Sequence, residues 1–127
     1  MARSEAVRVF RINTGSCGGC DLVIEETTRA SDILVWADDP YQADVLLVTG
    51  PVTPSVRPAF LALVRELGGR IPLVAVGRCA IDGHPFGRGG LLELRDVVVS
   101  EQIDGCPVTA EQLVDVVRRV ARQPARA

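Results

Sequence analysis

Residues 45–54 read Val45-Leu46-Leu47-Val48-Thr49-Gly50-Pro51-Val52-Thr53-Pro54, and the architecture of the chain is best inferred from this segment. Its first four residues are all large and aliphatic, which is typical of a central parallel strand buried on both faces. The strand is followed by a loop rich in Gly, Pro and Thr. Parallel neighbouring strands need crossover connections, so the segment predicts a sheet covered by helices.

Similar apolar runs lie on either side of this strand and alternate with helical patterns. We expect strands at 7–12, 33–36, 45–48, 73–76 and 97–99, and helices at 21–30, 56–67 and from 109 to about 120. Ser55 and Thr109 are placed to cap the second and third helices, and Gly68-Gly69 ends the second. The alternation predicts an α/β doubly wound sheet with mainly parallel strands, and the glycine-rich stretch 81–90 predicts an irregular loop.

Length and composition set the class of protein. With 127 residues, 47% of them hydrophobic, the chain is long enough for one domain with a substantial core. We expect this domain over 1–122, followed by a disordered tail at 123–127. No apolar run approaches the ~20 residues that span a membrane, and no signal peptide is recognisable. A net charge of −2 gives no reason to expect nucleic-acid binding, and the chain is expected to be cytoplasmic, where thiols stay reduced.

Four cysteines lie in short segments of small residues, where predicted strands end or a helix begins. Cys17 and Cys20 form a Cys-x-x-Cys pair directly after the first strand. Cys79 follows the strand at 73–76, and Cys106 precedes the last helix. Ligands of doubly wound sheets bind beyond the carboxyl ends of the strands, so we expect the four thiols to converge at that edge.

Four converging thiolates hold either a structural zinc ion or an iron–sulfur cluster. Zinc sites commonly use two close pairs, whereas this chain has one close pair and two single cysteines. The pattern favours a cluster, but spacing alone leaves zinc open. Buried core cysteines and a redox dithiol at Cys17 and Cys20 are further alternatives. Core cysteines fall more often inside helices or strands, and a dithiol leaves Cys79 and Cys106 unexplained.

Four sequence blocks, at 16–21, 43–53, 77–80 and 105–107, resemble in their order the small subunits of NiFe hydrogenases and the related 20 kDa (B-type) subunit of respiratory complex I. The resemblance covers nearly the whole chain. It implies a single flavodoxin-like domain that binds the 4Fe–4S cluster nearest to the active site of a large subunit. The cluster ligands implied by the resemblance are Cys17, Cys20, Cys79 and Cys106.

The spacing of the first two cysteines and the absence of a further cysteine-rich domain resemble the compact small subunits of complex-I-related (group 4) hydrogenases, including the formate hydrogenlyase type. The resemblance implies an electron relay without its own catalytic site. Its partners would be a hydrogenase-like large subunit and further iron–sulfur or membrane subunits, which could hold it at the inner face of the membrane. Two alternatives stay open: the B-type subunit of a complex-I-like quinone-linked oxidoreductase, and a zinc-stabilised interaction module without a redox role.

Several residues near the cysteines have expected supporting roles. Gly18 and Gly19 would let backbone N–H groups approach the cluster sulfurs. The resemblance implies that Thr49 shapes the pocket. Arg78, beside a predicted ligand, would either offset the negative charge of the cluster or be an ordinary surface arginine. Asp21 is expected to favour the start of its helix.

Two positions depart from the pattern of the resembled family. His84 stands where glycine is common, and Val108 stands where a second proline commonly follows the last cysteine. Neither position is a predicted ligand. Both favour a divergent complex whose large subunit reacts with something other than hydrogen.

Overall fold

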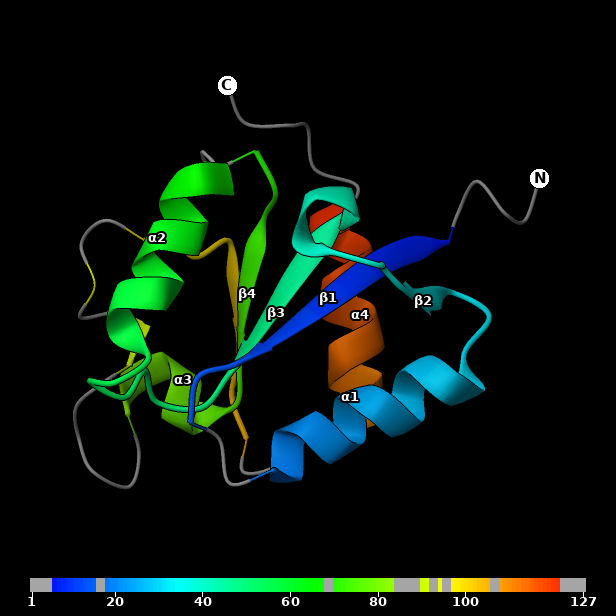
Figure 1. Ribbon diagram of the computed structural model, residues 1–127. Coiled ribbons are helices and arrows are strands. Elements are labelled where there is room, and N and C mark those ends of the chain that lie inside the picture. Colours follow the sequence, from blue (N-terminus) through cyan, green and yellow to red (C-terminus); the bar gives the residue numbers. More distant parts are fainter. Residues whose placement is uncertain are drawn as a thin grey trace.

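The computed structural model describes residues 6–15, 18–67, 70–83, 90–91, 94, 97–105 and 108–121. These residues form a central sheet with helices on both faces (Figure 1). The strands are β1 (Val7–Asn13), β2 (Leu34–Trp36), β3 (Val45–Thr49), β4 (Leu73–Val76) and β5 (Glu101–Ile103). The helices are α1 (Gly19–Ala30), α2 (Arg57–Leu67), α3 (Arg78–Asp82) and α4 (Ala110–Ala121), with a short 3-10 helix, η2, at Pro40–Gln42.

The sheet has the order β2-β1-β3-β4-β5, and each neighbouring pair of described strands is parallel. This is the flavodoxin-like order, in which the direction of winding reverses between β1 and β3. β3 lies in the middle of the sheet, and all of its residues are buried, as its aliphatic composition predicts. The expected α/β doubly wound sheet is therefore confirmed.

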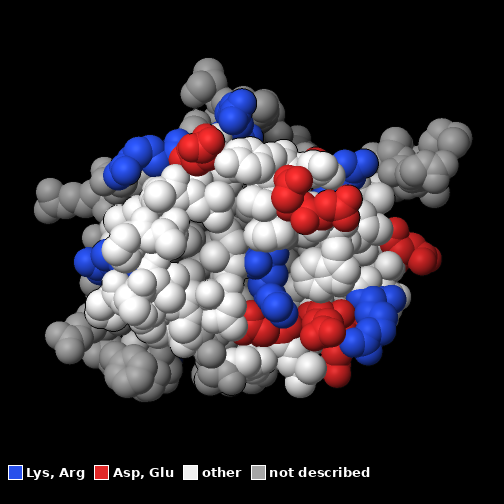
Figure 2. All heavy atoms as spheres, in the orientation of Figure 1, with Lys and Arg blue, Asp and Glu red and all other residues white. Residues whose placement is uncertain are grey.

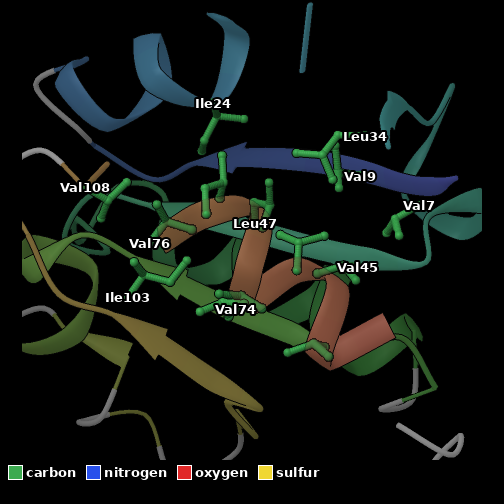
Figure 3. Close-up of a cluster of buried hydrophobic side chains, with 14 of the residues drawn as sticks. Val7, Val9, Ile24, Leu34, Val45, Leu47, Val74, Val76, Ile103 and Val108 are labelled. Carbon is green, nitrogen blue, oxygen red and sulfur yellow. The ribbon is translucent and has the colours of Figure 1, made fainter. Parts of the chain in front are cut away.

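Two apolar cores lie on the two faces of the sheet. α1 and α4 cover one face, where Ile24 of α1 packs with Leu47 and other aliphatic side chains (Figure 3). α2 covers the opposite face, where Phe60 packs with Leu46 and Val48. Successive residues of a strand point to opposite faces, which is why neighbouring residues of β3 belong to different cores.

The start of α4 is a capping box. The Gln112 backbone N–H donates to Thr109 Oγ1 at 3.1 Å, and the Thr109 N–H donates back to Gln112 Oε1 at 2.8 Å. The apolar face of the helix is buried and consists of Leu113, Val116, Val117 and Val120. The predicted cap of this helix is confirmed.

The predicted last strand at 97–99 is wrong, because β5 lies at Glu101–Ile103. Hydrogen bonding to β4 begins only at Ser100, whose N–H donates to the Leu73 carbonyl at 2.8 Å. Val97 is buried in the core on the α2 face, whereas Val98 is 60% exposed. The apolar run at 97–99 thus contributes a core side chain but does not pair as a strand. Apolar composition alone does not distinguish a strand from an unpaired segment that packs against the core.

Two helix boundaries near the cysteines also differ from the prediction. α1 begins at Gly19 rather than at 21, so Cys20 lies in its first turn. α3 occupies Arg78–Asp82, and its last two residues fall in the stretch from 81 onward where a loop was expected. α2 begins at Arg57, close to the expected start at 56. The predictions for Gly68-Gly69, for His84 and for the tail at 123–127 fall outside the described residues.

Acidic and arginine side chains are interspersed on the face shown in Figure 2, around a broad uncharged area. This face therefore offers no extended basic surface among the residues that the structure describes. Within the same described ranges, none of the helices has the length and apolar character needed to cross a membrane.

Candidate metal centre at the carboxyl edge of the sheet

The segments that carry the cysteines meet at the carboxyl edge of the sheet. The Gly77 N–H donates to the Ile103 carbonyl at 2.8 Å, and the Arg78 N–H donates to the Gly105 carbonyl at 2.9 Å. These bonds hold the start of α3 against the residues that directly precede Cys106. Figure 1 shows the first turn of α1 and helix α3 at this same end of the sheet.

Cys20 lies against the turn that leads to Cys79. A Cβ atom built on Gly77 would lie only 2.6 Å from Cys20 Sγ and 3.5 Å from the Gly105 carbonyl oxygen. The backbone of Gly77 also has a φ of +94°, which side chains other than hydrogen rarely allow. The bare Cα of Gly77 therefore leaves the space that the Cys20 thiol occupies.

The four predicted ligands differ in what the structure describes. Cys20 is buried in the first turn of α1, and Cys79 is half-buried at the start of α3. Cys17 and Cys106 lie outside the described residues. In the part of the chain that is described, no group of three or more His, Cys, Asp or Glu side chains is arranged to hold a metal ion. The four-cysteine ligand set stays a prediction.

Among the residues that the structure describes, no side chain caps the N-terminus of α1. Its N-cap residue is Gly18, with a left-handed φ of +102° and no side-chain hydrogen bond. The first N–H groups of a helix have no partner within the helix, and the positive end of the helix dipole lies there. An anionic group bound through Cys20 would lie at this favourable end. The roles predicted for Gly18 and Gly19 agree with this geometry but are not tested by it.

Behind Cys20, the Asp21 carboxylate is buried among polar side chains from two strands. Thr49 Oγ1 donates to Asp21 Oδ1 at 2.8 Å, and Asn13 Nδ2 donates to Asp21 Oδ2 at 3.1 Å. Arg11 Nε lies 3.4 Å from Asp21 Oδ1. Thr49 was expected to shape the pocket, and its observed partner is Asp21. Sequence patterns gave no signal for Asn13 or Arg11, because neither lies in a motif.

The loops after β1 and β3 are bound to each other. Thr14 is fully buried, and its Oγ1 donates to the carbonyls of Thr49 and Gly50 at 2.8 and 3.0 Å. Its own carbonyl accepts from Thr53 Oγ1 at 3.2 Å. Asn13 Oδ1 accepts from the Gly15 N–H at 2.8 Å. The backbone that leads into the Cys-x-x-Cys segment is therefore fixed before the first cysteine is reached.

Arg78 lies at the rim of this edge. Its Nε is 3.4 Å from Asp104 Oδ1, and the two side chains are 51% and 64% exposed. An exposed pair of this kind contributes about 0–1 kcal/mol to stability. The expected role of Arg78 beside a cluster stays a prediction.

The fold and the cysteine-bearing edge define the class: a flavodoxin-like α/β domain in which Cys20 and Cys79 lie beyond the carboxyl ends of the central strands. Residues 17–120 match the family described as NADH ubiquinone oxidoreductase, 20 Kd subunit, and the chain belongs to this family of oxidoreductase subunits. The predicted membership is confirmed.

Two relatives and one solved structure are similar to this chain over most of its length. The chain is 33% identical over 132 residues to the Uncharacterized protein MJ0516 of Methanocaldococcus jannaschii, a match that covers 95% of this chain and 86% of that protein. It is 30% identical over 114 residues to the probable membrane-bound hydrogenase subunit mbhJ of Pyrococcus furiosus, covering 84% of this chain and 68% of that subunit. A chain of the membrane-bound sulfane sulfur reductase (MBS), an archaeal respiratory membrane complex, shares the fold with a TM-score of 0.63 at 19% identity. This match covers 94% of this chain and 71% of that chain.

Proposed function

We propose that this chain is the electron-transfer small subunit of a hydrogenase-like complex, and that it carries one 4Fe–4S cluster beside the active site of a large subunit. The observation that carries the proposal is the contact of Cys20 Sγ with Gly77, two residues before Cys79 and hydrogen-bonded to the segment before Cys106. Three cysteine-bearing segments that are far apart in the sequence are thereby neighbours at one edge.

The donor set suits an iron–sulfur cluster. Cys17, Cys20, Cys79 and Cys106 would hold it, since such clusters are bound by four cysteine thiolates. When bound, the cluster would supply one-electron transfer. The chain's own residues would exclude water from the sulfur of Cys20, which is 5% exposed, and would direct N–H groups of the α1 N-terminus toward the site.

The surface beside the site is suited to a partner. Leu22, two residues after Cys20 in α1, is a large apolar side chain that is 55% exposed. A large subunit that covers this edge would bury the Leu22 side chain. Attachment to the inner face of the membrane would come through such partner subunits, as the name of the Pyrococcus relative suggests for that protein.

A complex-I-like quinone-linked oxidoreductase is the second candidate, and the family description favours it. The separated Cys17 and Cys20 and the match over most of mbhJ favour the hydrogenase-like complex. The same cluster would serve both, so the two candidates differ in the large subunit. A co-purified large subunit that contains nickel supports the first candidate, and one without nickel supports the second.

The decisive experiment is metal and sulfide analysis of the complex purified without oxygen, with an EPR spectrum after reduction. We expect about four iron and about four sulfide ions per chain, and the signal of a reduced cluster. Cys79→Ser should remove or convert the cluster, whereas the exposed α1 variant Glu26→Gln should leave it unchanged. One zinc ion without sulfide would instead identify a structural module, and an unaltered cluster in Cys79→Ser would refute the ligand assignment.

A further inference from the structure

The Asp21 carboxylate joins three elements at the point where the candidate cluster would be bound. It lies in the first turn of α1, directly after Cys20, and its side chain is only 10% exposed. Its hydrogen-bond donors come from the end of β1 (Asn13) and the end of β3 (Thr49). A buried carboxylate with these donors fixes the rotation of the first turn of α1 relative to the two strands.

The same network reaches the other side of the Cys-x-x-Cys segment. Asn13 donates to Asp21 through Nδ2 and accepts from the Gly15 N–H through Oδ1. One amide side chain therefore connects the residue after Cys20 with the backbone that leads toward Cys17. Removing the carboxylate would weaken the support of both ends of the segment, because the Asn13 amide would lose one of the partners that orient it.

Arg11 supplies charge to this network. Its Nε lies 3.4 Å from Asp21 Oδ1, and its side chain is 36% exposed. Partly buried charges are screened less by solvent than exposed ones. A negative group near a redox centre disfavours the addition of an electron, and a positive group favours it. Asp21 and Arg11 should therefore act in opposite directions on a centre bound through Cys20.

We propose that Asp21 is a positioning residue that holds Cys20 and the segment after Asn13 in the geometry needed to bind the cluster, and that its pairing with Arg11 sets the local field at that cluster. The effect on the cluster rests on the proposed function. The positioning of Cys20 does not, and it can be tested in the metal-free chain.

The first test measures the reactivity of Cys20 in the full-length, metal-free chain. Asp21→Ala should raise the rate of Cys20 alkylation several-fold, followed by mass spectrometry, because a thiol that is 5% exposed becomes accessible when the first turn of α1 is released. Glu26→Gln, an exposed acid on the same helix, is the control for charge. Circular dichroism must show that both variants are folded. An alkylation rate equal to that of the control, or one that rises only as the whole chain unfolds, would overturn the positioning role.

The second test uses the cluster-loaded complex. Asp21→Asn removes the charge and keeps the shape, so the reduction potential should rise, whereas Arg11→Gln should lower it. Redox titration followed by EPR measures both. Equal potentials in the two variants and in Glu26→Gln would overturn the electrostatic part of the proposal. If the wild-type complex contains no iron or sulfide, the proposed function and the electrostatic part fail, and the alkylation result alone decides the positioning role.

Discussion

α1 and α4 cover the same face of the sheet and have the same length of 12 residues, yet their N-termini are built differently. α4 begins with a capping box, in which Gln112 reaches back to Thr109. α1 has Gly18 at its N-cap position, without a side-chain cap, and its equivalent third residue, Asp21, is bound by side chains of β1 and β3 instead. In α4, side chains of the capping box accept hydrogen bonds from N–H groups at the helix N-terminus. The N-terminus of α1 has glycine at its N-cap position, and the carboxylate in its first turn is held by side chains of the strands behind it.

This difference indicates that the start of α1 is optimised for something other than local helix stability. Capping by Ser, Thr, Asp or Asn typically stabilises a helix by about 1 kcal/mol. In α1 that contribution is absent, and a more elaborate network of buried polar groups takes its place. The following variants test whether the N-termini of α1 and α4 have different roles.

The largest effect is expected for Gly77→Ala. Its Cβ atom would lie 2.6 Å from Cys20 Sγ, and the φ of +94° would be strained as well. Strain alone costs about 1–3 kcal/mol, and the displaced thiol should abolish cluster binding. Gly18→Ala is the matched control in the metal-free chain, since it has a similar φ and no described atom within 4 Å of the added Cβ. Thermal unfolding should show a smaller loss for the control, and equal losses would contradict the steric argument.

Thr49→Val should have the next largest effect. It removes a hydroxyl that donates to a buried carboxylate at 2.8 Å, and a buried polar group left without its partner costs about 1–3 kcal/mol. Thr49→Ser keeps the donor and serves as the control. Denaturant unfolding of the metal-free chain gives the stabilities. If Val and Ser behave alike, the hydroxyl does not support Asp21.

Thr109→Ala should reduce stability by about 1 kcal/mol, because it removes the hydroxyl that accepts from the Gln112 N–H. The iron and sulfide content of the folded complex should stay at the wild-type level. A clear loss of cluster from this variant would mean that the two helix starts are coupled, and that the contrast drawn between them is wrong.

Arg78→Gln should have the smallest effect on stability, less than about 1 kcal/mol, because its ion pair with Asp104 is exposed. Thermal unfolding at low and high salt measures the contribution of the pair. A lowered reduction potential in the cluster-loaded complex would support the predicted role of Arg78 beside the cluster, and an unchanged potential would make it a surface arginine.

Local sequence was sufficient for much of the fold and for the placement of the cysteine segments. The aliphatic run at 45–48 became the central strand, and Thr109 became the cap of α4. The prediction that the cysteines lie at one edge of the sheet agrees with the positions of Cys20 and Cys79, because parallel strands deliver their trailing loops together.

The remainder depended on contacts between distant segments. Val97 packs in the core on the α2 face of the sheet. Nothing in the sequence around it shows that strand β5 begins only after Ser100. Asp21 has the sequence signature of a helix-start acid, but its partners Asn13 and Thr49 are supplied by two other elements. The importance of Gly77 becomes visible only when Cys20 is placed beside it. Such relations exist in three dimensions and leave no local pattern.

The contact between Cys20 and Gly77 also has a consequence for the assembly of the protein. Cys20 belongs to the first helix, whereas Gly77 follows β4 and is hydrogen-bonded to Ile103, the last residue of β5. Contacts between segments so distant in the chain are slow to form, because a long loop must close first. A nascent chain that ends before β4 would contain Cys20 but not the turn at Gly77 that packs against its sulfur. Insertion of the proposed cluster would then follow folding, and the thiols would have to stay reduced until the last strand has paired.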